Sequence, residues 1–336
     1  MHSDVNRFYF SGFKSSAGAV VITKNNAFLL VDFRYFENAK RNVKCLEVLM
    51  FSSLYNILNE ILNKENIKEI FLETDYLTLD NFKSLKQKLN GFSISEDNKI
   101  CEIITQMRSI KDSEELGFIQ EAQSITDNAF SHILEFIKPQ KTEKEIALEL
   151  EFFMRKNGSC GVAFETIAVS GKNSSLPHGV PTDKEIHNGD FITLDFGAVV
   201  GGYCSDMTRT VAVGNVTDKM REVYDTVLHA QTEALKNIKP NYECKSIDGI
   251  ARDIIENAGF SGCFGHGLGH SVGLEIHESP SFNTRDETLL QEGMVLTVEP
   301  GIYIENEFGV RIEDMVYITD NGYENLTKSP KGLIIL

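Results

Sequence analysis

The first 110 residues alternate short strand-like and helix-like patterns of apolar and polar positions. Runs of β-branched and aromatic residues predict strands, and apolar positions three or four residues apart predict helices. The expected strands cover 19–23, 27–31 and 69–73, and the expected helices cover 44–63 and 82–89. Asn25–Asn26 should form the turn between the first two strands, and Asp32–Tyr35 is interpreted as a structural turn with a local ion pair. This order of elements predicts a small α/β domain without a cluster of catalytic side chains.

Strong helix-start signals mark the beginning of a second region near residue 111. Asp112 or Ser113 can cap a helix that continues until Pro139, and a capping box at 142–145 opens the next helix. Two further amphipathic helices, which we expect to pack on a sheet, cover 218–238 and 246–257. We therefore predict two domains, residues 1–110 and residues 111–336.

Acidic residues interrupt several apolar, strand-like runs in the second region. Strands are expected over 164–169, 294–301 and 309–318, and a hairpin is expected over 191–211. Asp195 ends an apolar run, and Asp206 returns eleven positions later on the partner strand, across a Gly201–Gly202 turn. Glu299 and Glu313 belong to the last two strands. Because a half-buried carboxylate must be paired or bound to a cation, these acids either share one site or have separate hydrogen-bond partners.

Histidines and glycines are concentrated between residues 265 and 278. His266, His270 and His277 fall within twelve positions, and a zinc-protease helix would need two of them on one face. That helix is disfavoured because Gly267 stands where the catalytic glutamate should follow, and each glycine would cost a helix about 1 kcal/mol. The sequence predicts an irregular or extended segment that presents imidazoles into a cleft, with a glycine-rich surface turn as the alternative.

The composition limits the kinds of partner that the protein is expected to bind and the cellular compartment in which it is expected. The chain of 336 residues is 42% hydrophobic and carries a formal charge of −16, which disfavours binding to nucleic acid or to anionic membranes. The N-terminus lacks the pattern of a secretion signal, and no apolar run reaches the roughly 18 residues of a membrane span. Six scattered cysteines without a C-x-x-C pair indicate reduced thiols and a cytoplasmic protein.

The acids and one histidine together match the donor set of a site for two divalent metals. The five candidate ligands are Asp195, Asp206, His270, Glu299 and Glu313. Oxygen donors with a single nitrogen favour Mn²⁺, and Co²⁺, Zn²⁺ or Fe²⁺ stay open. Two metals about 3.5–4 Å apart could bridge a hydroxide and hold the carbonyl group that it attacks. A polar loop at 170–179 adds His178, which could donate to the developing oxyanion together with the other two histidines.

The order and local context of these ligands resemble the metallopeptidase family with the pita-bread fold. That family includes methionine aminopeptidase, aminopeptidase P, prolidase and the metal-free creatinase. The matching motifs are Leu194-Asp195-Phe196-Gly197, Ser205-Asp206-Met207-Thr208-Arg209-Thr210, Gly265-His266-Gly267-Leu268-Gly269-His270, Glu299-Pro300-Gly301 and Arg311-Ile312-Glu313-Asp314. The resemblance implies an α/β (α+β) chain, in which a pita-bread catalytic domain follows a smaller creatinase-like α/β domain.

The resemblance also implies a role for each metal ligand. Asp195 would chelate one metal, and Asp206 and Glu313 would bridge both metals. His270 and Glu299 would complete the coordination of the second metal. Glu299 would in addition act as the general base that accepts the proton of the water.

Four further residues match positions that contact or support the substrate in this family. His178, His266 and His277 correspond to the substrate-contacting histidines, and Arg311 corresponds to a supporting position of the prolyl members. The segment Val272–Glu278 and the presence of an N-terminal domain resemble the prolyl and creatinase branch more than methionine aminopeptidase.

The sequence thus predicts a cytoplasmic, homodimeric Xaa-Pro aminopeptidase that hydrolyses short proline-containing peptides through a metal-bridging hydroxide. An Xaa-Pro dipeptidase (prolidase) and a broader Met-Xaa aminopeptidase are alternatives within the same class. A metal-independent, creatinase-like hydrolase and a non-catalytic peptide-binding module are alternatives from other classes, and the full set of five ligands disfavours both. Metal content and hydrolysis of Xaa-Pro and Xaa-Pro-Yaa peptides would separate these hypotheses.

Overall fold

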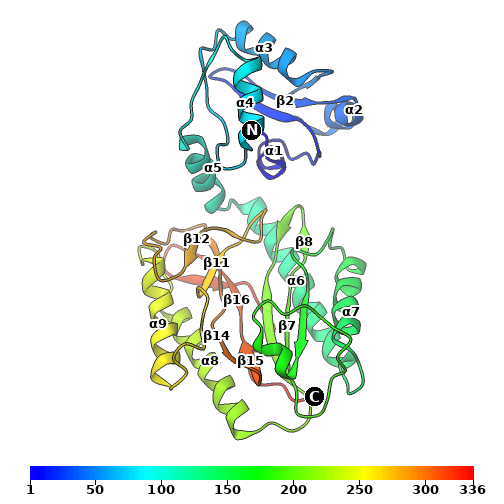
Figure 1. Ribbon diagram of the computed structural model, residues 1–336, viewed down its shortest axis with the longest axis vertical. Coiled ribbons are helices and arrows are strands. Elements are labelled where there is room, and N and C mark those ends of the chain that lie inside the picture. Colours follow the sequence, from blue (N-terminus) through cyan, green and yellow to red (C-terminus); the bar gives the residue numbers. More distant parts are fainter. The chain divides into compact units, whose positions relative to one another are not determined.

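The computed structural model describes residues 1–336 and divides them into two compact units, Met1–Met107 and Arg108–Leu336 (Figure 1). The N-terminal unit alternates helices with short strands. Its elements are α1 (Asp4–Ser11), β1 (Ala19–Ile22), β2 (Ala27–Val31), α2 (Phe33–Asn42), β3 (Glu47–Met50), α3 (Leu54–Lys64), β4 (Glu69–Ile70), α4 (Leu79–Lys88) and β5 (Ser93–Ile94), followed by α5 (Lys99–Ser109), whose last turn enters the second unit.

The N-terminal unit confirms the hairpin and α4, but the expected helix over 44–63 is wrong in its first half. Glu47–Met50 instead forms β3, which pairs in parallel with β2, and the helix begins only at Leu54. Tertiary pairing therefore decides the structure of a short apolar run that periodicity alone assigns to a helix. Asp32 forms the expected ion pair with Arg34 at 2.6 Å, but the expected turn is wrong, because Asp32 caps α2 and residues 33–35 are helical.

The second unit contains long helices and many short strands. Its elements are α6 (Ser113–Phe136), α7 (Glu143–Lys156), β6 (Ile167–Ser170), the 3₁₀ helix η1 (Gly171–Ser175), β7 (Phe191–Phe196), β8 (Val199–Val200), β9 (Tyr203–Cys204), β10 (Met207–Ala212), α8 (Asp218–Lys236), α9 (Cys244–Asn257), β11 (Gly269–Ser271), β12 (Glu278–Phe282), β13 (Val295–Val298), β14 (Gly301–Ile304), β15 (Phe308–Arg311), β16 (Asp314–Ile318) and β17 (Tyr323–Asn325). No helix combines the length and the apolar character needed to cross a bilayer.

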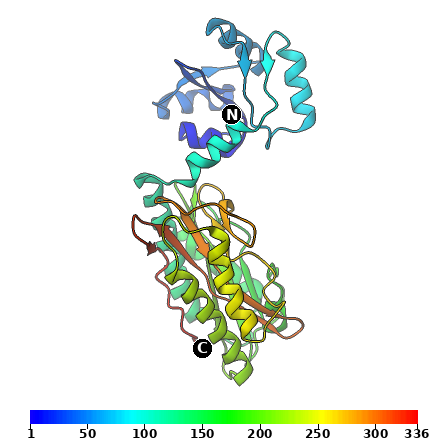
Figure 2. The same ribbon diagram turned by 90° about the vertical axis from the view of Figure 1, so that its left-hand side faces the viewer.

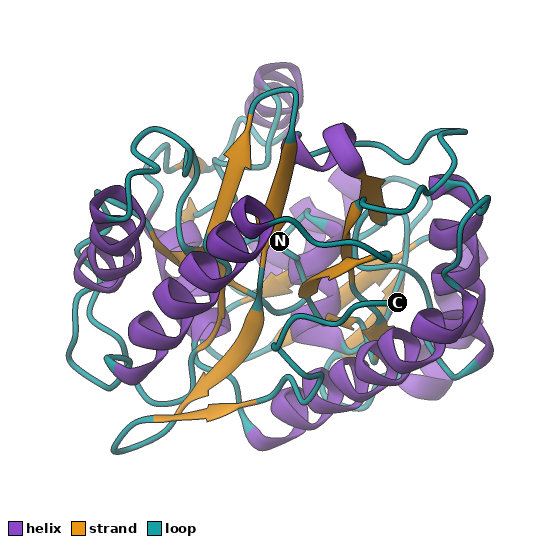
Figure 3. Cartoon of the chain, turned by 90° about the horizontal axis from the view of Figure 1, so that it is seen from below, coloured by secondary structure: helices purple, strands orange, loops and turns teal.

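Two antiparallel sheets form the middle layer of this unit, with strand orders β10-β7-β6 and β12-β11-β13-β16-β17. Helices α6 and α7 pack on the first sheet through side chains that include Phe130, Ile146 and Leu194. Helices α8 and α9 pack on the second sheet (Figures 1 and 2), through a core that includes Leu296 and Val316. The helices (purple) therefore lie outside the strands (orange) in Figure 3, and the strand ends are left to shape a site.

Local capping explains why α6 and α7 begin where the sequence predicts. Asp112 accepts from the backbone N–H groups of Glu114 and Glu115, and Thr142 accepts from that of Glu145. In both helices the glutamate side chain returns the bond to the capping residue, so three N–H groups are satisfied at the start of α6 and two at the start of α7.

The expected strand over 309–318 is broken, and the break separates two sheets. β15 ends at Arg311 and pairs with β14, whereas β16 begins at Asp314 and pairs with β13 and β17. Glu313 lies in the connection, so its side chain is not constrained by the alternation of a continuous strand. The strand expected over 164–169 likewise begins only at Ile167.

Candidate active site

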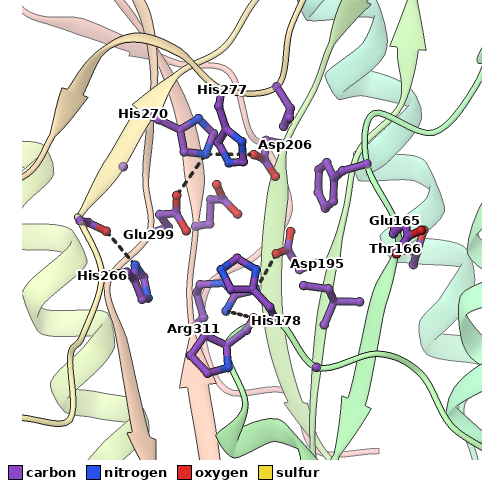
Figure 4. A pocket seen from close by; sticks show the side chains of 18 of the residues that line it. Glu165, Thr166, His178, Asp195, Asp206, His266, His270, His277, Glu299 and Arg311 are labelled. Atoms are coloured by element: carbon purple, nitrogen blue, oxygen red, sulfur yellow. Dashed lines mark hydrogen bonds and ion pairs between the residues drawn. The ribbon is translucent and has the colours of Figure 1, made fainter.

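All nine residues that the sequence proposes for the site line one cavity of about 510 Å³ in the second unit (Figure 4). They are His178, Asp195, Asp206, His266, His270, His277, Glu299, Arg311 and Glu313. They come from both sheets and from the loops between the strands, so folding brings together side chains far apart in the sequence. The roles predicted for them stay predictions.

The two aspartates come from the hairpin of β7 and β10. Asp195 lies on β7 opposite Thr208, and Asp206 immediately precedes β10. The Gly201–Gly202 turn does not join these long strands directly but connects the short pair β8 and β9. Asp206 is buried and Asp195 is half-buried, and both line the cavity.

His270 and Glu299 approach each other from neighbouring strands of the second sheet. His270 lies on β11, and Glu299 follows β13 directly. The Nε2 atom of His270 lies 3.3 Å from Oε1 of Glu299 and 3.6 Å from Oδ2 of Asp206. Thr297 supports both residues, because its hydroxyl accepts from the backbone N–H of His270 and donates to Glu299.

Glu313 enters the cluster from the connection between β15 and β16. Its Oε2 atom accepts a hydrogen bond of 2.7 Å from Thr208, whose carbonyl also accepts from the Glu313 backbone N–H. The buried guanidinium of Arg209 donates to the Glu313 carbonyl and forms an ion pair of 2.8 Å with Asp314. One ligand atom each from Asp206, His270 and Glu313 lies within 4.8 Å of the others.

The electrostatics of this cluster favour a bound cation. Burial and the neighbouring carboxylates hold the pKa values of Asp206 and Glu313 well above their usual range. Burial also raises the pKa of Asp195, although Arg311 opposes the shift. Oδ1 of Asp195 and Oε1 of Glu313 are buried without a hydrogen-bond partner. Carboxylate oxygens with one imidazole suit a divalent metal, which would supply both the positive charge and the missing partners.

Within the same cluster, the pKa of Glu299 is lowered rather than raised. Burial alone would raise its pKa, but the hydrogen bond and charge of His270, together with His266 and Arg311, lower the pKa to about 2. Burial would lower the pKa of His270, and Glu299 raises it instead. Glu299 is therefore ionised at neutral pH, the state in which a carboxylate can accept a proton.

Every nitrogen of the Arg311 guanidinium is used within the protein. Nη2 donates to Asp195 at 2.5 Å, and Nε donates to Thr208 at 3.0 Å. Nη1 donates to the Tyr303 hydroxyl and to the carbonyl of Pro177. Four of the five N–H groups of Arg311 therefore bind within the protein, where they hold the aspartate and the neighbouring loop in place.

The three cavity histidines that are not proposed ligands differ in how their rings are bound. His266 uses both nitrogens, because Nδ1 lies 2.8 Å from the carbonyl of Gly267 and Nε2 lies 2.9 Å from the Tyr303 hydroxyl. Burial lowers the pKa of His266, which favours its neutral ring. The rings of His178 and His277 form no hydrogen bond within the chain and are free to bind a ligand.

Tyr303 is a site residue that the sequence analysis missed. It is a lone tyrosine on β14, and its hydroxyl joins Arg311 to His266. The only signal in the sequence is its position between Glu299 and Glu313. That signal does not distinguish Tyr303 from any other strand aromatic.

Close packing beside His270 requires glycine at position 269. A Cβ atom there would lie 2.0 Å from the carbonyl oxygen of Thr297. We expect Gly269→Ala to destabilise the protein by about 2–3 kcal/mol, because the clash involves backbone atoms that cannot turn away. Thermal unfolding measures the effect, and Gly265→Ala is the control because a Cβ at that position meets nothing within 4 Å. Equal losses in the two variants would contradict the prediction.

Comparisons with known proteins agree with this geometry. Residues 117–320 match the family model "Metallopeptidase family M24", and residues 1–110 match "Creatinase/Prolidase N-terminal domain". An Xaa-Pro dipeptidase from Pyrococcus furiosus is 43% identical over 331 residues, which cover 98% of this chain and 93% of that protein.

Two solved structures have nearly the same fold. An Xaa-Pro dipeptidase from Bacillus anthracis superposes with a TM-score of 0.95 at 42% identity, covering 99% of this chain and 93% of that chain. An X-Pro aminopeptidase from Thermotoga maritima gives a TM-score of 0.93 at 39% identity, covering 99% and 94%.

Proposed function

The chain belongs to metallopeptidase family M24, and in its sequence a pita-bread unit follows a creatinase-type N-terminal unit. On this basis we propose that it hydrolyses Xaa-Pro bonds. The observation that carries the proposal is the cluster of four carboxylates and one imidazole on the wall of a single cavity. The metallopeptidase family implies divalent metal ions, and the buried, unpaired oxygens of Asp195 and Glu313 fit such ions.

Five side chains hold the two metals in this proposal. Asp195 would bind one metal, Asp206 and Glu313 would serve both, and His270 and Glu299 would complete the other. The support is the donor set and the raised pKa values of Asp206 and Glu313, since protons or cations must offset their charge. Divalent cations at this place supply a more acidic water and a polarised carbonyl group.

The remaining groups of the site move a proton and stabilise charge. Glu299, which is ionised at neutral pH, accepts the proton of the attacking water as general base. His178 and His277 donate hydrogen bonds to the carbonyl oxygen as negative charge develops, because their rings are otherwise unbound. His266 and Arg311 act together through Tyr303 and hold the wall of the cavity next to the substrate.

The dipeptidase is the first candidate, and the relatives support it better than the aminopeptidase that the sequence analysis favours. The relatives named Xaa-Pro dipeptidase include a curated protein 43% identical to this chain and the solved structure with a TM-score of 0.95. The proposed substrates are therefore short peptides in which proline follows the first residue, with Xaa-Pro dipeptides as the best substrates.

The aminopeptidase stays a second candidate because of one feature of the cavity. A dipeptidase must hold the carboxylate of the proline residue, and a positively charged side chain is the usual partner of such a group. Arg311 is the only arginine or lysine that lines the cavity, and all its nitrogens are already bound. A longer peptide, whose carboxylate lies farther out, needs no such partner.

A peptide panel separates the two candidates. We expect the metal-loaded protein to cleave Xaa-Pro dipeptides and to cleave Xaa-Ala dipeptides at least about tenfold less efficiently, because the cavity must recognise the ring. A similar tenfold preference for Xaa-Pro over Xaa-Pro-Yaa supports the dipeptidase, and comparable kcat/KM values support the aminopeptidase. Failure to cleave any peptide with proline in the second position would refute the proposal.

Four further properties belong to the proposal. Mn²⁺ is the proposed metal because oxygen donors predominate at the site. A homodimer is proposed from the family resemblance, and sedimentation measures it. The cytoplasm is the proposed compartment, since all six cysteines are free thiols. The domain boundary is proposed near residue 110, next to the division between the two compact units.

A further inference from the structure

We infer that Glu143 is a positioning residue for the proposed reaction, because its buried carboxylate holds together both ends of the loop that carries His178. Glu143 itself does not line the cavity. The kinetic part of this inference rests on the proposed peptidase activity, and its structural part does not.

The Glu143 carboxylate is fully buried at the first turn of α7 and is saturated with hydrogen bonds. Oε1 accepts from the backbone N–H and hydroxyl of Ser170, at 2.7 and 3.0 Å, and from the amide of Asn173 at 3.1 Å. Oε2 accepts from the backbone N–H and hydroxyl of Thr182, at 3.0 and 2.6 Å, and again from Asn173 at 3.2 Å. No lysine or arginine touches this carboxylate, so loop donors alone offset its charge.

The two oxygens bind opposite ends of one loop. Ser170 is the last residue of β6, and Thr182 lies where the chain leaves the cavity rim. One carboxylate therefore closes the base of the segment 171–181, which contains η1 and the cavity residues Pro177 and His178. Removing either set of bonds would release one end of the loop.

Backbone anchoring is the main way in which His178 can be positioned. Its side chain is exposed and forms no hydrogen bond within the chain, and the neighbouring Val180 is 69% exposed. The bonds that join the tip to other segments run from Arg311 to the carbonyl of Pro177 and from the Gly309 N–H to Ser174, and the Gly179 N–H donates to Leu176 within the loop. The base held by Glu143 therefore sets where the imidazole stands in the cavity.

A glutamine at position 143 tests this arrangement with little change in shape. Its amide group keeps one acceptor oxygen and replaces the other with an N–H₂ group that faces donors. Either the Ser170 end or the Thr182 end then loses its acceptor. Because an error of about 1 Å in a group that contacts the substrate can cost up to 100-fold in rate, we expect kcat/KM to fall about 10- to 100-fold.

The kinetic experiment uses the full-length, metal-loaded protein and an Xaa-Pro dipeptide. Four variants are compared with the wild type: Glu143→Gln, His178→Ala, the double variant, and Glu145→Gln as control. Glu145 lies on the same turn of α7 and binds Thr142 and Lys141 rather than the loop. We expect the control to leave kcat/KM within about twofold, and the double variant to be no slower than His178→Ala, since both changes act through one imidazole.

A second measurement needs no substrate. Lys172 is exposed within the loop, so trypsin cleavage after it reports how often the loop leaves its folded position. Cleavage at Lys172 should be at least about fivefold faster in Glu143→Gln than in Glu145→Gln. Thr182→Val replaces Glu143→Gln in both measurements if the latter does not fold. It removes the hydroxyl that donates to Glu143 and accepts from the Lys184 N–H.

The outcomes are distinguishable. Two results together support the inference. Trypsin cleaves Glu143→Gln faster at Lys172, and Glu143→Gln lowers kcat/KM in the wild type but not in a protein that already carries His178→Ala. Any of three results overturns the inference: the losses of kcat/KM in Glu143→Gln and His178→Ala add in the double variant, Glu143→Gln loses bound metal, or trypsin cleaves it at Lys172 no faster than the control. A wild-type protein that hydrolyses no Xaa-Pro peptide refutes the proposed function, and the trypsin measurement then still decides whether Glu143 anchors the loop.

Discussion

Replacement of Glu299 with glutamine is expected to lower kcat/KM for an Xaa-Pro dipeptide by about 10³- to 10⁴-fold. The carboxylate lies 3.3 Å from the His270 ring, and the ring lowers its pKa to about 2, so the wild-type side chain is ionised at neutral pH. Glutamine has nearly the same shape but cannot accept a proton and is a poorer ligand. Steady-state kinetics, with the bound metal counted by mass spectrometry, measures the result.

The matched control for this substitution is Glu305→Gln. Glu305 is exposed on the turn after β14 and binds only the side chain of Asn306, so its kcat/KM should stay within about twofold of the wild type. A Glu299→Gln protein that retains more than about a tenth of the activity would exclude Glu299 as the general base. If Glu299→Gln loses activity only in proportion to the metal that it loses, Glu299 is a metal ligand and does not transfer the proton.

Removal of divalent metal is expected to abolish activity and to lower the unfolding temperature by about 5–10 °C at neutral pH. Metal at a hundredfold excess over its Kd stabilises a protein by about 2.7 kcal/mol. For a unit of this size, each kcal/mol shifts the unfolding temperature by about 2–4 °C. Calorimetry of chelated protein, before and after Mn²⁺ is added back, measures the shift.

The stabilisation by metal should grow as the pH rises. Burial and mutual repulsion raise the pKa values of Asp206 and Glu313 above those of the unfolded chain. As the pH increases from the unfolded pKa toward the raised folded pKa, the unfolded state releases protons first, so the metal-depleted protein loses stability. Metal binding also strengthens with pH because the ligands must be deprotonated. The shift measured at pH 8 should therefore exceed the shift at pH 5.

Asp206→Asn provides the control for the second prediction. The neutral amide removes one buried charge, so the metal-depleted variant should unfold at a higher temperature than the metal-depleted wild type at pH 8. The same variant should respond weakly to Mn²⁺, because it lacks a proposed bridging ligand. A metal-induced shift that is independent of pH, or a full Mn²⁺ response in the variant, would contradict the assignment of this cluster.

Local features of the sequence were sufficient for the starts of α6 and α7. The caps at Asp112 and Thr142 act within one turn, and their hydrogen bonds are the ones that the spacing of glutamate three residues later predicts. The strands were harder to predict, because a short apolar run is compatible with either a strand or a helix. Residues 47–50 became β3 only because β2 offers a parallel partner.

In the candidate site, too, the sequence reveals some residues and only the tertiary structure reveals others. Carboxylates in apolar runs, such as Asp195, are recognisable because strands disfavour them unless something binds them. Tyr303 and Glu143 carry no such mark, since a tyrosine on a strand and a glutamate at the start of a helix are both ordinary. Their importance arises from contacts with residues that are distant in the chain.

The sequence by itself determined the starts of α6 and α7, the identity of the five proposed ligands and the exclusion of a helical zinc motif at His266–His270. These follow from short-range chemistry: capping, the cost of burying charge, and the cost of glycine in a helix. Only the tertiary structure decided that Glu313 leaves its strand to enter the cluster, that Arg311 binds Asp195 and the neighbouring loop, and that Glu143 closes the His178 loop. Pairing between strands and burial of polar groups depend on which distant segments meet, and that information is not local to any stretch of the chain.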